Sequence, residues 1–166
     1  METKGGFYIT QIKQLQDRIF EKMLIEEGIE LSSGQGRILF ILWKRDRLTI
    51  SELSRETSLA KNTVSIVVDG MVNRGIVSRS SNPDNRRQQI VSLTEYARSI
   101  QDKYEAVSQR MNELFYRGFT REERMDFEDC LTRILETLTL AEQGRLSVKY
   151  RENSEENDYD HKREGI

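Results

Sequence analysis

The sequence predicts a mainly α-helical fold with one small β-hairpin. Apolar residues recur at three- and four-residue steps along most of the chain, which is the spacing of helices with one buried face. Alternating apolar residues occur at 76–80 and 88–93, on either side of the turn sequence "NPDN" (82–85). Turn residues between two alternating segments are typical of a β-hairpin.

The composition favours a soluble, helix-rich, cytoplasmic protein. The 166 residues are 36% hydrophobic and 33% charged, and the mean hydropathy is −0.68. No apolar run approaches the roughly 20 residues of a membrane span, and the amino terminus lacks the apolar core of a signal peptide. Because the chain has one cysteine (Cys130) and one histidine (His161), we expect no internal disulfide and no metal site rich in histidine or thiolate, although a carboxylate site remains an alternative. We expect no bound metal and no cofactor.

Residues 7–27 are predicted to form the first helix, which Gly28 ends. Its main apolar face is formed by Tyr8, Ile12, Leu15, Ile19 and Met23.

Capping signals mark the next three helices. Ser32 and Gln35 have the spacing of a capping box, and Thr49 and Glu52 repeat it ahead of the short helix "ISELSRETS". The helix "KNTVSIVVDGMVNRG" (61–75) ends at Gly75, where a left-handed residue is expected. The two arms of the hairpin follow it.

Thr94 is expected to cap a long helix with a coiled-coil-like apolar seam. The seam consists of Ala97, Ile100, Tyr104, Val107, Met111 and Leu114. After a break at "RGFT", Thr120 and Glu123 open the last helix, whose apolar face is formed by Phe127, Leu131, Ile134 and Leu138. From about Gly144 the chain becomes polar, which is typical of a disordered tail.

A helix, a short helix, a third helix and a hairpin follow one another in the order of a winged helix-turn-helix. In such a lobe the last helix presents its first residues to the DNA major groove. Here those residues include Asn62, Thr63 and Ser65, small polar side chains that can reach base edges. Arg86 and Arg87 lie at the hairpin turn, and a narrow minor groove attracts arginine. An ordinary amphipathic helix beside solvated arginines is the alternative interpretation.

The charge distribution favours a polyanionic partner for this lobe. Residues 33–94 carry ten basic and five acidic residues, a net charge of +5, whereas the remainder carries 16 basic and 23 acidic residues, a net charge of −7. A basic module between acidic flanks is typical of nucleic-acid binding.

Three stretches together resemble the MarR (multiple antibiotic resistance regulator) family of transcriptional regulators. They are "LSSGQGRILFIL" (31–42), "LTISELSRETSLAKNTVSIVVDGMVNRGIVSR" (48–79) and "NPDNRRQQIVSLTEYAR" (82–98). The resemblance implies a homodimer with interleaved terminal helices and two winged lobes that bind one palindromic operator. It also implies repression, often relieved by a small anionic or phenolic ligand or by oxidation.

The resemblance implies a recognition helix at 61–74 and a minor-groove arginine at the wing tip. The implied DNA contacts are Lys61, Asn62, Thr63, Ser65, Arg86 and Arg87. Four positions depart from the family pattern. Asn85 replaces a usual aspartate, Ile66 and Gly70 stand where arginine is common, and Ala60 replaces a capping aspartate.

The expected organisation is an amino-terminal dimerisation helix (1–30), a winged helix-turn-helix lobe (31–94), carboxy-terminal dimerisation helices (95–143) and a polar tail (144–166). An organic effector would bind between the lobe and the dimer helices. Its candidate walls are Tyr8, Ile12, Phe40 and Trp43, for each of which core packing is the simpler explanation.

Two other function classes are weighed against this one. An enzyme is disfavoured because no nucleophile with a base and no phosphate loop is evident. A winged helix used only for protein–protein contacts remains the alternative. Within the MarR family, a thiol sensor usually has its reactive cysteine in the first helix, whereas Cys130 lies in the last helix and is expected to be a partly buried packing residue.

Overall fold

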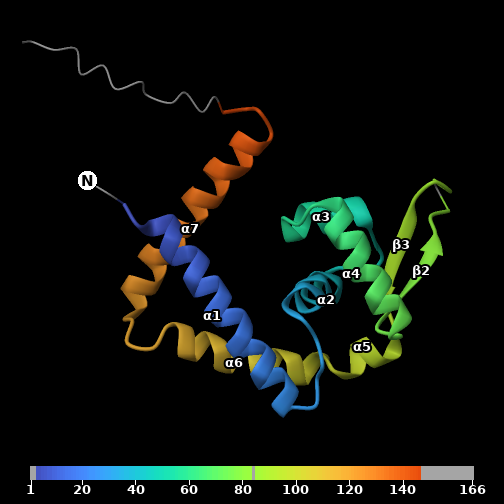
Figure 1. Cartoon of the computed structure of the whole chain (residues 1–166), viewed down its shortest axis with the longest axis horizontal. Helices are drawn as coiled ribbons and strands as arrows, with labels where there is room; N and C mark the ends of the chain where they lie inside the picture. Colours follow the sequence, from blue (N-terminus) through green and yellow to red (C-terminus); the bar gives the residue numbers. More distant parts are fainter. Residues whose placement is uncertain (1–2, 84, 147–166) are drawn as a thin grey trace, which may run out of the picture. The chain divides into compact units, whose positions relative to one another are not determined.

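The computed structural model describes residues 3–83 and 85–146, and the chain divides into two compact units between Arg117 and Gly118 (Figure 1). The first unit contains α1 (Gly5–Glu26), α2 (Ser33–Lys44), β1 (Leu48–Thr49), α3 (Ile50–Thr57), α4 (Lys61–Asn73), β2 (Val77–Ser81), β3 (Gln89–Leu93), α5 (Glu95–Ser99) and α6 (Gln101–Phe115). The second contains α7 (Arg121–Glu142). The predicted fold class, mainly helical with a hairpin wing, is confirmed.

The predicted helix boundaries rest on hydrogen bonds that the structure contains. The hydroxyls of Ser32, Thr49 and Thr120 each accept a hydrogen bond from the backbone N–H three residues on, and the side chain of that residue accepts one from the backbone N–H of the capping residue. Gly28 and Gly75 end α1 and α4 with φ angles of +75° and +67°, a conformation that suits glycine.

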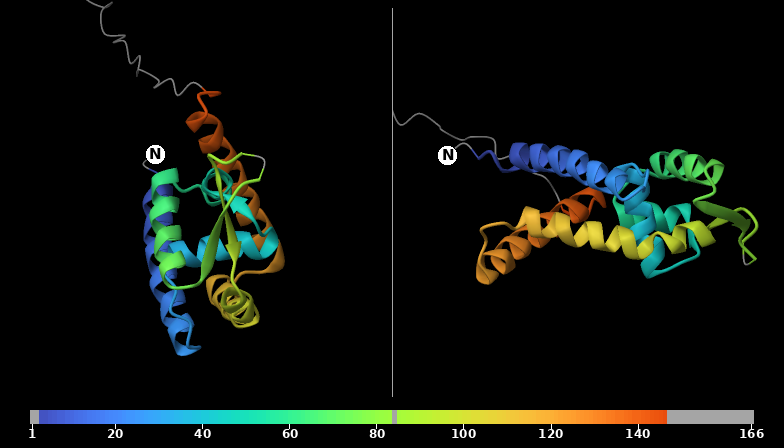
Figure 2. Two further views of the ribbon diagram at one scale, coloured as in Figure 1. Left: turned by 90° about the vertical axis from the view of Figure 1, so that its right-hand side faces the viewer. Right: turned by 90° about the horizontal axis from the view of Figure 1, so that it is seen from below.

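The hairpin belongs to a three-stranded antiparallel sheet in the order β1–β3–β2. Leu48 of β1 pairs with Val91, and Val77 of β2 pairs with Leu93. The two-residue strand β1 was not predicted, because two residues are too few to show alternation. The hairpin projects beyond the helices, away from the start of α1 (Figure 2).

Asp46 fixes the segment before β1. Its carboxylate accepts bonds from Leu93 N at 2.9 Å and Arg47 N at 2.8 Å, and it pairs with Arg98. Partial burial acts to raise the pKa of Asp46, but these hydrogen bonds outweigh it and lower the pKa below its usual value.

The core of the first unit is centred on α2 and α4. Ile38, Leu39 and Leu42 of α2 are fully buried against the inner side of α4. That inner side is formed by Val64, Val67, Val68 and Met71: three of the four side chains have no exposed surface and Val67 is half-buried. The outer side of α4 is exposed, so its side chains are accessible to another molecule.

The prediction of one long helix after Thr94 was wrong. The helix is interrupted at Ile100, so that α5 and α6 are separate. The predicted seam also packs within its own chain: Ala97, Tyr104 and Val107 are at most 6% exposed. The rings of Phe20 and Trp43 lie 5.3 and 4.8 Å from that of Tyr104, centroid to centroid. Side chains of α1 and α2 thus pack against Tyr104 of α6, one of the residues whose spacing had predicted a coiled-coil-like seam.

Gly36 of α2 allows this aromatic cluster to form. A Cβ added to Gly36 would lie 2.6 Å from the Tyr104 hydroxyl oxygen, and the ring is held by its neighbours. Gly36→Ala should therefore lower the free energy of unfolding by about 1–3 kcal/mol, as overpacking does. Urea denaturation measures the loss. Adding Tyr104→Phe should recover part of it, and a Gly36→Ala variant as stable as the parent would contradict the close contact.

The apolar face of α7, the helix of the second unit, is exposed. Among the described residues of α7 none is buried, and Ile134, Leu135 and Leu138 are 45%, 59% and 63% exposed. Cys130, expected to be partly buried, is exposed and accepts a hydrogen bond from Arg133. Most of the predicted polar tail, from 147 onward, lies outside the described residues. No helix in the part of the chain described here is long and apolar enough to cross a bilayer.

Candidate nucleic-acid interface

The candidate interface begins with the turn that positions α4. The Ser54 hydroxyl donates to the Leu59 carbonyl at 2.6 Å, and the Thr57 hydroxyl donates to the Leu53 carbonyl at 2.6 Å. Ser58 takes a left-handed conformation with φ of 54° to close α3. These bonds hold α3 and α4 as a helix-turn-helix pair.

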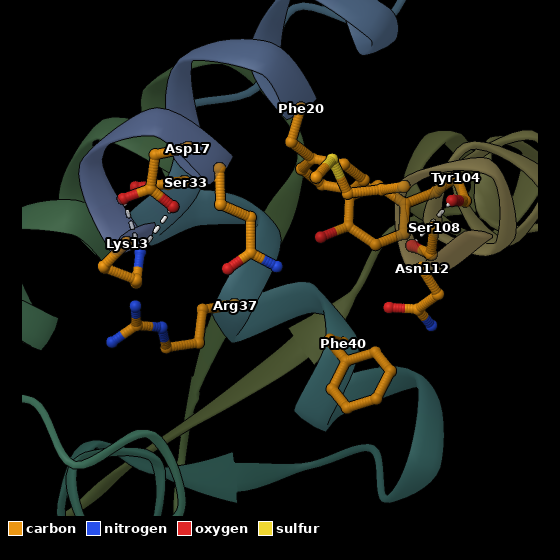
Figure 3. A pocket seen from close by; sticks show the side chains of 11 residues that line it. Lys13, Asp17, Phe20, Ser33, Arg37, Phe40, Tyr104, Ser108 and Asn112 are labelled. Carbon is orange, nitrogen blue, oxygen red and sulfur yellow. Dashed lines mark hydrogen bonds and ion pairs between the residues drawn. The ribbon is translucent and has the colours of Figure 1, made fainter. Parts of the chain in front are cut away.

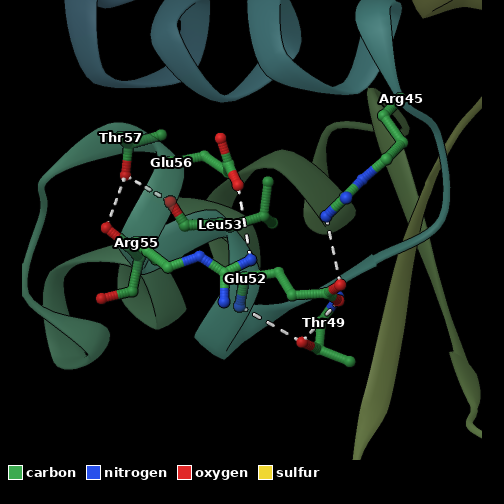
Figure 4. A network of polar contacts seen from close by, with 8 residues as sticks. Arg45, Thr49, Glu52, Leu53, Arg55, Glu56 and Thr57 are labelled. Atoms are coloured by element: carbon green, nitrogen blue, oxygen red, sulfur yellow. Dashed lines mark hydrogen bonds and ion pairs between the residues drawn. The ribbon is translucent and has the colours of Figure 1, made fainter.

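A polar network fixes the start of α3 (Figure 4). One oxygen of Glu52 accepts bonds from the Thr49 backbone at 2.9 Å and hydroxyl at 2.8 Å, and the other pairs with Arg45 at 3.1 Å. The bonds from Thr49 lower the pKa of Glu52, against a smaller opposing effect of burial and with help from the charges of Arg45 and Arg55. The network anchors the first helix of the pair rather than forming a reactive site.

The predicted contacts on α4 differ in exposure. Lys61, Asn62 and Thr63 are exposed in the first turn, whereas Ser65 is half-buried and turned toward the wing. Ala60 caps the helix without a side-chain hydrogen bond.

The wing turn is held by Asn85, which stands where the resemblance implies an aspartate. The Asn85 side-chain oxygen accepts a bond from Arg87 N at 3.1 Å, and its carbonyl accepts one from Gln88 N at 2.8 Å. Arg86 and Arg87 are exposed on this turn. A neutral amide can thus order the backbone that carries Arg87.

Arg79 joins the wing to α4, and sequence reasoning missed it. Its guanidinium lies 2.8 Å from the Asp69 carboxylate, 3.4 Å from the Ser65 carbonyl oxygen and 3.4 Å from the Gln89 side-chain oxygen. Only 22% of its side chain is exposed. Arg79 lies on the same face of β2 as the buried Val77. The alternation of side chains along a strand could therefore have identified Arg79, because an arginine that points inward requires a hydrogen-bond acceptor.

A polar cleft of about 280 Å³ lies where α3, α4 and the wing meet. It brings together two predicted contacts, Ser65 and Arg87, with Arg79 and the first residues of α3. The other predicted contacts, Lys61, Asn62, Thr63 and Arg86, lie outside the lining.

Asp69→Asn should lower the free energy of unfolding by about 1 kcal/mol, since the pair with Arg79 is only partly exposed. Part of the loss should disappear at 1 M salt, because screening already weakens the pair there. Urea denaturation at two salt concentrations provides the measurement. Asp129→Asn is the matched control, since both partners of that ion pair are at least 68% exposed. Equal losses in the two variants would contradict a structural role for Arg79.

A second cleft, of about 300 Å³, lies among α1, α2 and α6 of the first unit (Figure 3). Phe40 and Arg37 line it with Phe20, Tyr104 and the Lys13–Asp17 ion pair. Burial raises the pKa of Tyr104 to about 12, against a smaller lowering by the charge of Arg37, so its hydroxyl stays protonated at neutral pH.

Three of the four predicted effector walls lie elsewhere. Tyr8 and Ile12 are outside the lining of this cleft, 53% and 41% exposed on α1. Trp43 packs behind Tyr104 and donates a hydrogen bond from its indole to the Ala97 carbonyl at 3.0 Å.

Residues 31–88 match the model of the MarR family, the segment that contains the helix-turn-helix pair and most of the wing. The similarity to the MarR family is thus shown for this segment of the chain. Its fold resembles that of a probable transcriptional regulator from Pseudomonas aeruginosa, with 25% identity and a TM-score of 0.71 over 78% of this chain and 95% of that one.

A mutant of MarR from E. coli, solved in complex with operator DNA, has the same fold, with 24% identity and a TM-score of 0.72 over 78% and 92% of the two chains. The HTH-type transcriptional repressor YetL of Bacillus subtilis is 33% identical over 69 residues. That match spans 40% of this chain and 41% of YetL. The chain thus has the fold and the family domain of transcriptional regulators.

Proposed function

We propose that this protein is a cytoplasmic, sequence-specific DNA-binding repressor that binds a palindromic operator as a homodimer and responds to a small organic effector. The observation that carries the proposal is the arrangement of α4 and the wing. The inner face of α4 is buried, its polar first turn faces outward, and the wing arginines project from the same lobe.

The DNA contacts divide into two kinds in this proposal. Asn62 and Ser65 contact base edges in the major groove, with Lys61 and Thr63 on the adjoining phosphates. Arg87 enters the minor groove and Arg86 neutralises phosphate beside it. The fold of MarR, which has been solved with operator DNA, supports this assignment.

Two exposed apolar faces support the homodimer. The first half of α1 presents Phe7, Tyr8 and Leu15 at 50–63% exposure, and α7 presents Ile134, Leu135 and Leu138. Contiguous apolar surface of this kind is typical of an interface. A well-folded monomer in light scattering at micromolar concentration would contradict the homodimer.

The cleft around Phe40 is the effector site in this proposal. Arg37 provides positive charge beside the rings of Phe20 and Phe40, which suits an aromatic carboxylate, whereas the charge of Lys13 is balanced by Asp17. An effector changes DNA affinity only if it binds the two conformations of the dimer differently. Unchanged DNA binding with millimolar salicylate would exclude that ligand class.

A mobility shift tests the DNA-binding function directly. The probe is the DNA upstream of the protein's own gene, and a scrambled duplex of equal length and composition is the control. Tighter binding to the upstream DNA at a fixed salt concentration supports the proposal. No binding to either duplex would favour the alternative, a winged-helix module for protein–protein contacts.

A further inference from the structure

Ile66 lies on the recognition helix with its apolar side chain uncovered. It is 72% exposed, and no other large apolar side chain in the described part of the chain is more exposed. Burying such a side chain is favourable by about 1.5–3 kcal/mol, and contacts within this chain do not provide that stabilisation. Ile66 stands at a position where arginine is common in the MarR family.

Ile66 occupies the middle of the face of α4 that points away from the core. At 100° per residue it lies opposite the buried side formed by Val64 and Met71. Asn62 lies one turn before it and Gly70 one turn after it. A Cβ built on Gly70 meets nothing within 4 Å, so the space beside Ile66 is open.

The surroundings of Ile66 are wrong for a protein interface. The exposed neighbours on this face are polar or charged: Asn62, Thr63, Asp69 and Asn73. An apolar partner surface needs a contiguous patch, and the apolar faces of this chain lie on α1 and α7 instead. A single apolar group among hydrogen-bonding groups is complementary to a surface that itself presents single apolar groups among hydrogen-bond donors and acceptors.

The floor of the DNA major groove is such a surface. Each base pair displays donors and acceptors there, and thymine adds a C5-methyl group with which apolar side chains make contact. We propose that Ile66 selects thymine, by packing against the C5-methyl group of a thymine in the operator while Asn62 contacts a neighbouring base. The proposal rests on the DNA-binding function proposed above.

Replacing thymine with uracil tests this inference, because it removes the methyl group and keeps the base pairing. The probe is the upstream duplex that gives the mobility shift, prepared with thymine or with uracil. The parent protein should bind the uracil duplex about fourfold more weakly for each methyl contact, or roughly 15-fold for one contact per subunit. Single uracil substitutions then identify the thymines that are contacted.

Three variants give this experiment its controls. Ile66→Ala should bind the thymine duplex more weakly and bring the ratio of the two affinities close to one. Ile25→Ala, at an isoleucine 63% exposed outside the lobe and outside the apolar face in the first half of α1, should keep the parent's ratio. Arg87→Ala should weaken binding to both duplexes and keep the parent's ratio.

The outcomes separate this inference from the function on which it rests. Equal affinity of the parent protein for the two duplexes would overturn the role of Ile66 and leave DNA binding intact. A ratio unchanged in Ile66→Ala would also overturn it, because thymine would then be selected by another residue. Failure to bind either duplex would overturn the proposed function and the role of Ile66 together.

Discussion

Arg87→Ala should weaken binding to operator and scrambled DNA by similar factors, while leaving the fold unchanged. The side chain is exposed at the wing tip, so its removal opens no cavity. The minor groove distinguishes little beyond A·T from G·C pairs, and an arginine there contributes affinity more than selectivity. A lost charge-assisted contact costs about 1.5–3 kcal/mol per subunit.

The salt dependence identifies the kind of contact that is lost. The slope of log affinity against log salt concentration falls by about one for each phosphate-neutralising charge removed, and therefore by about two for a dimer. Salt titrations on operator and scrambled duplexes measure this slope. A variant that loses affinity for the operator alone would show that Arg87 selects sequence, contrary to its assigned role.

Asn62→Ala is the matched control on the recognition helix. It should cost about 1–3 kcal/mol on the operator and little on scrambled DNA, because a base-edge contact carries sequence preference. Its salt slope should stay at the parent's value, since no charge is removed. Equal losses on the two duplexes would reverse the roles given to helix and wing.

Local signals in the sequence predicted most of the fold. The pairs Ser32–Gln35 and Thr49–Glu52 form capping boxes because three-residue spacing suffices to bring side chain and backbone together. Gly75 ends α4 for a similarly local reason, its positive φ. Such features depend on a few consecutive residues, which is why the sequence alone discloses them.

Features that depend on distant residues were missed. The burial of Tyr104 follows from packing against Phe20 and Trp43, each more than 60 residues away from it, and no periodicity within α6 reveals that packing or the break at Ile100. The ion pair between Arg79 and Asp69 likewise joins β2 to α4, two elements that come into contact only when the chain folds. For the candidate site, the exposed residues of α4 could be proposed from the sequence, whereas the coupling of α4 to the wing could not.

Leu138→Asp should convert the protein from a dimer into a monomer. Leu138 is 63% exposed on α7, so the substitution disturbs little within the chain itself. In a symmetric dimer each substitution counts twice, and losing a buried leucine costs about 1.5–3 kcal/mol per copy before the cost of burying a charge is added. Sedimentation or light scattering at micromolar concentration distinguishes the two states, since one chain has a mass of 19.5 kDa.

Two truncations accompany this substitution. Ending the chain after Ile134 removes Leu135 and Leu138 together and should cost solubility as well as dimerisation, because the apolar side chains that remain on α1 and α7 stay exposed in a monomer. Removing 145–166 should change neither property. A dimer that survives Leu138→Asp would place the interface elsewhere than on α7.

The monomer should also bind DNA differently, which links assembly to function. Two lobes held at a fixed separation contact two half-sites at once, whereas a single lobe contacts one. With half the phosphate contacts, the salt slope of Leu138→Asp should fall to about half the parent's value, and operator affinity should fall toward that for scrambled DNA. Arg87→Ala lowers the slope by removing one contact per lobe, and Leu138→Asp does so by removing one lobe of two. A slope that stays at the parent's value in a monomeric variant would show that one lobe makes all the phosphate contacts.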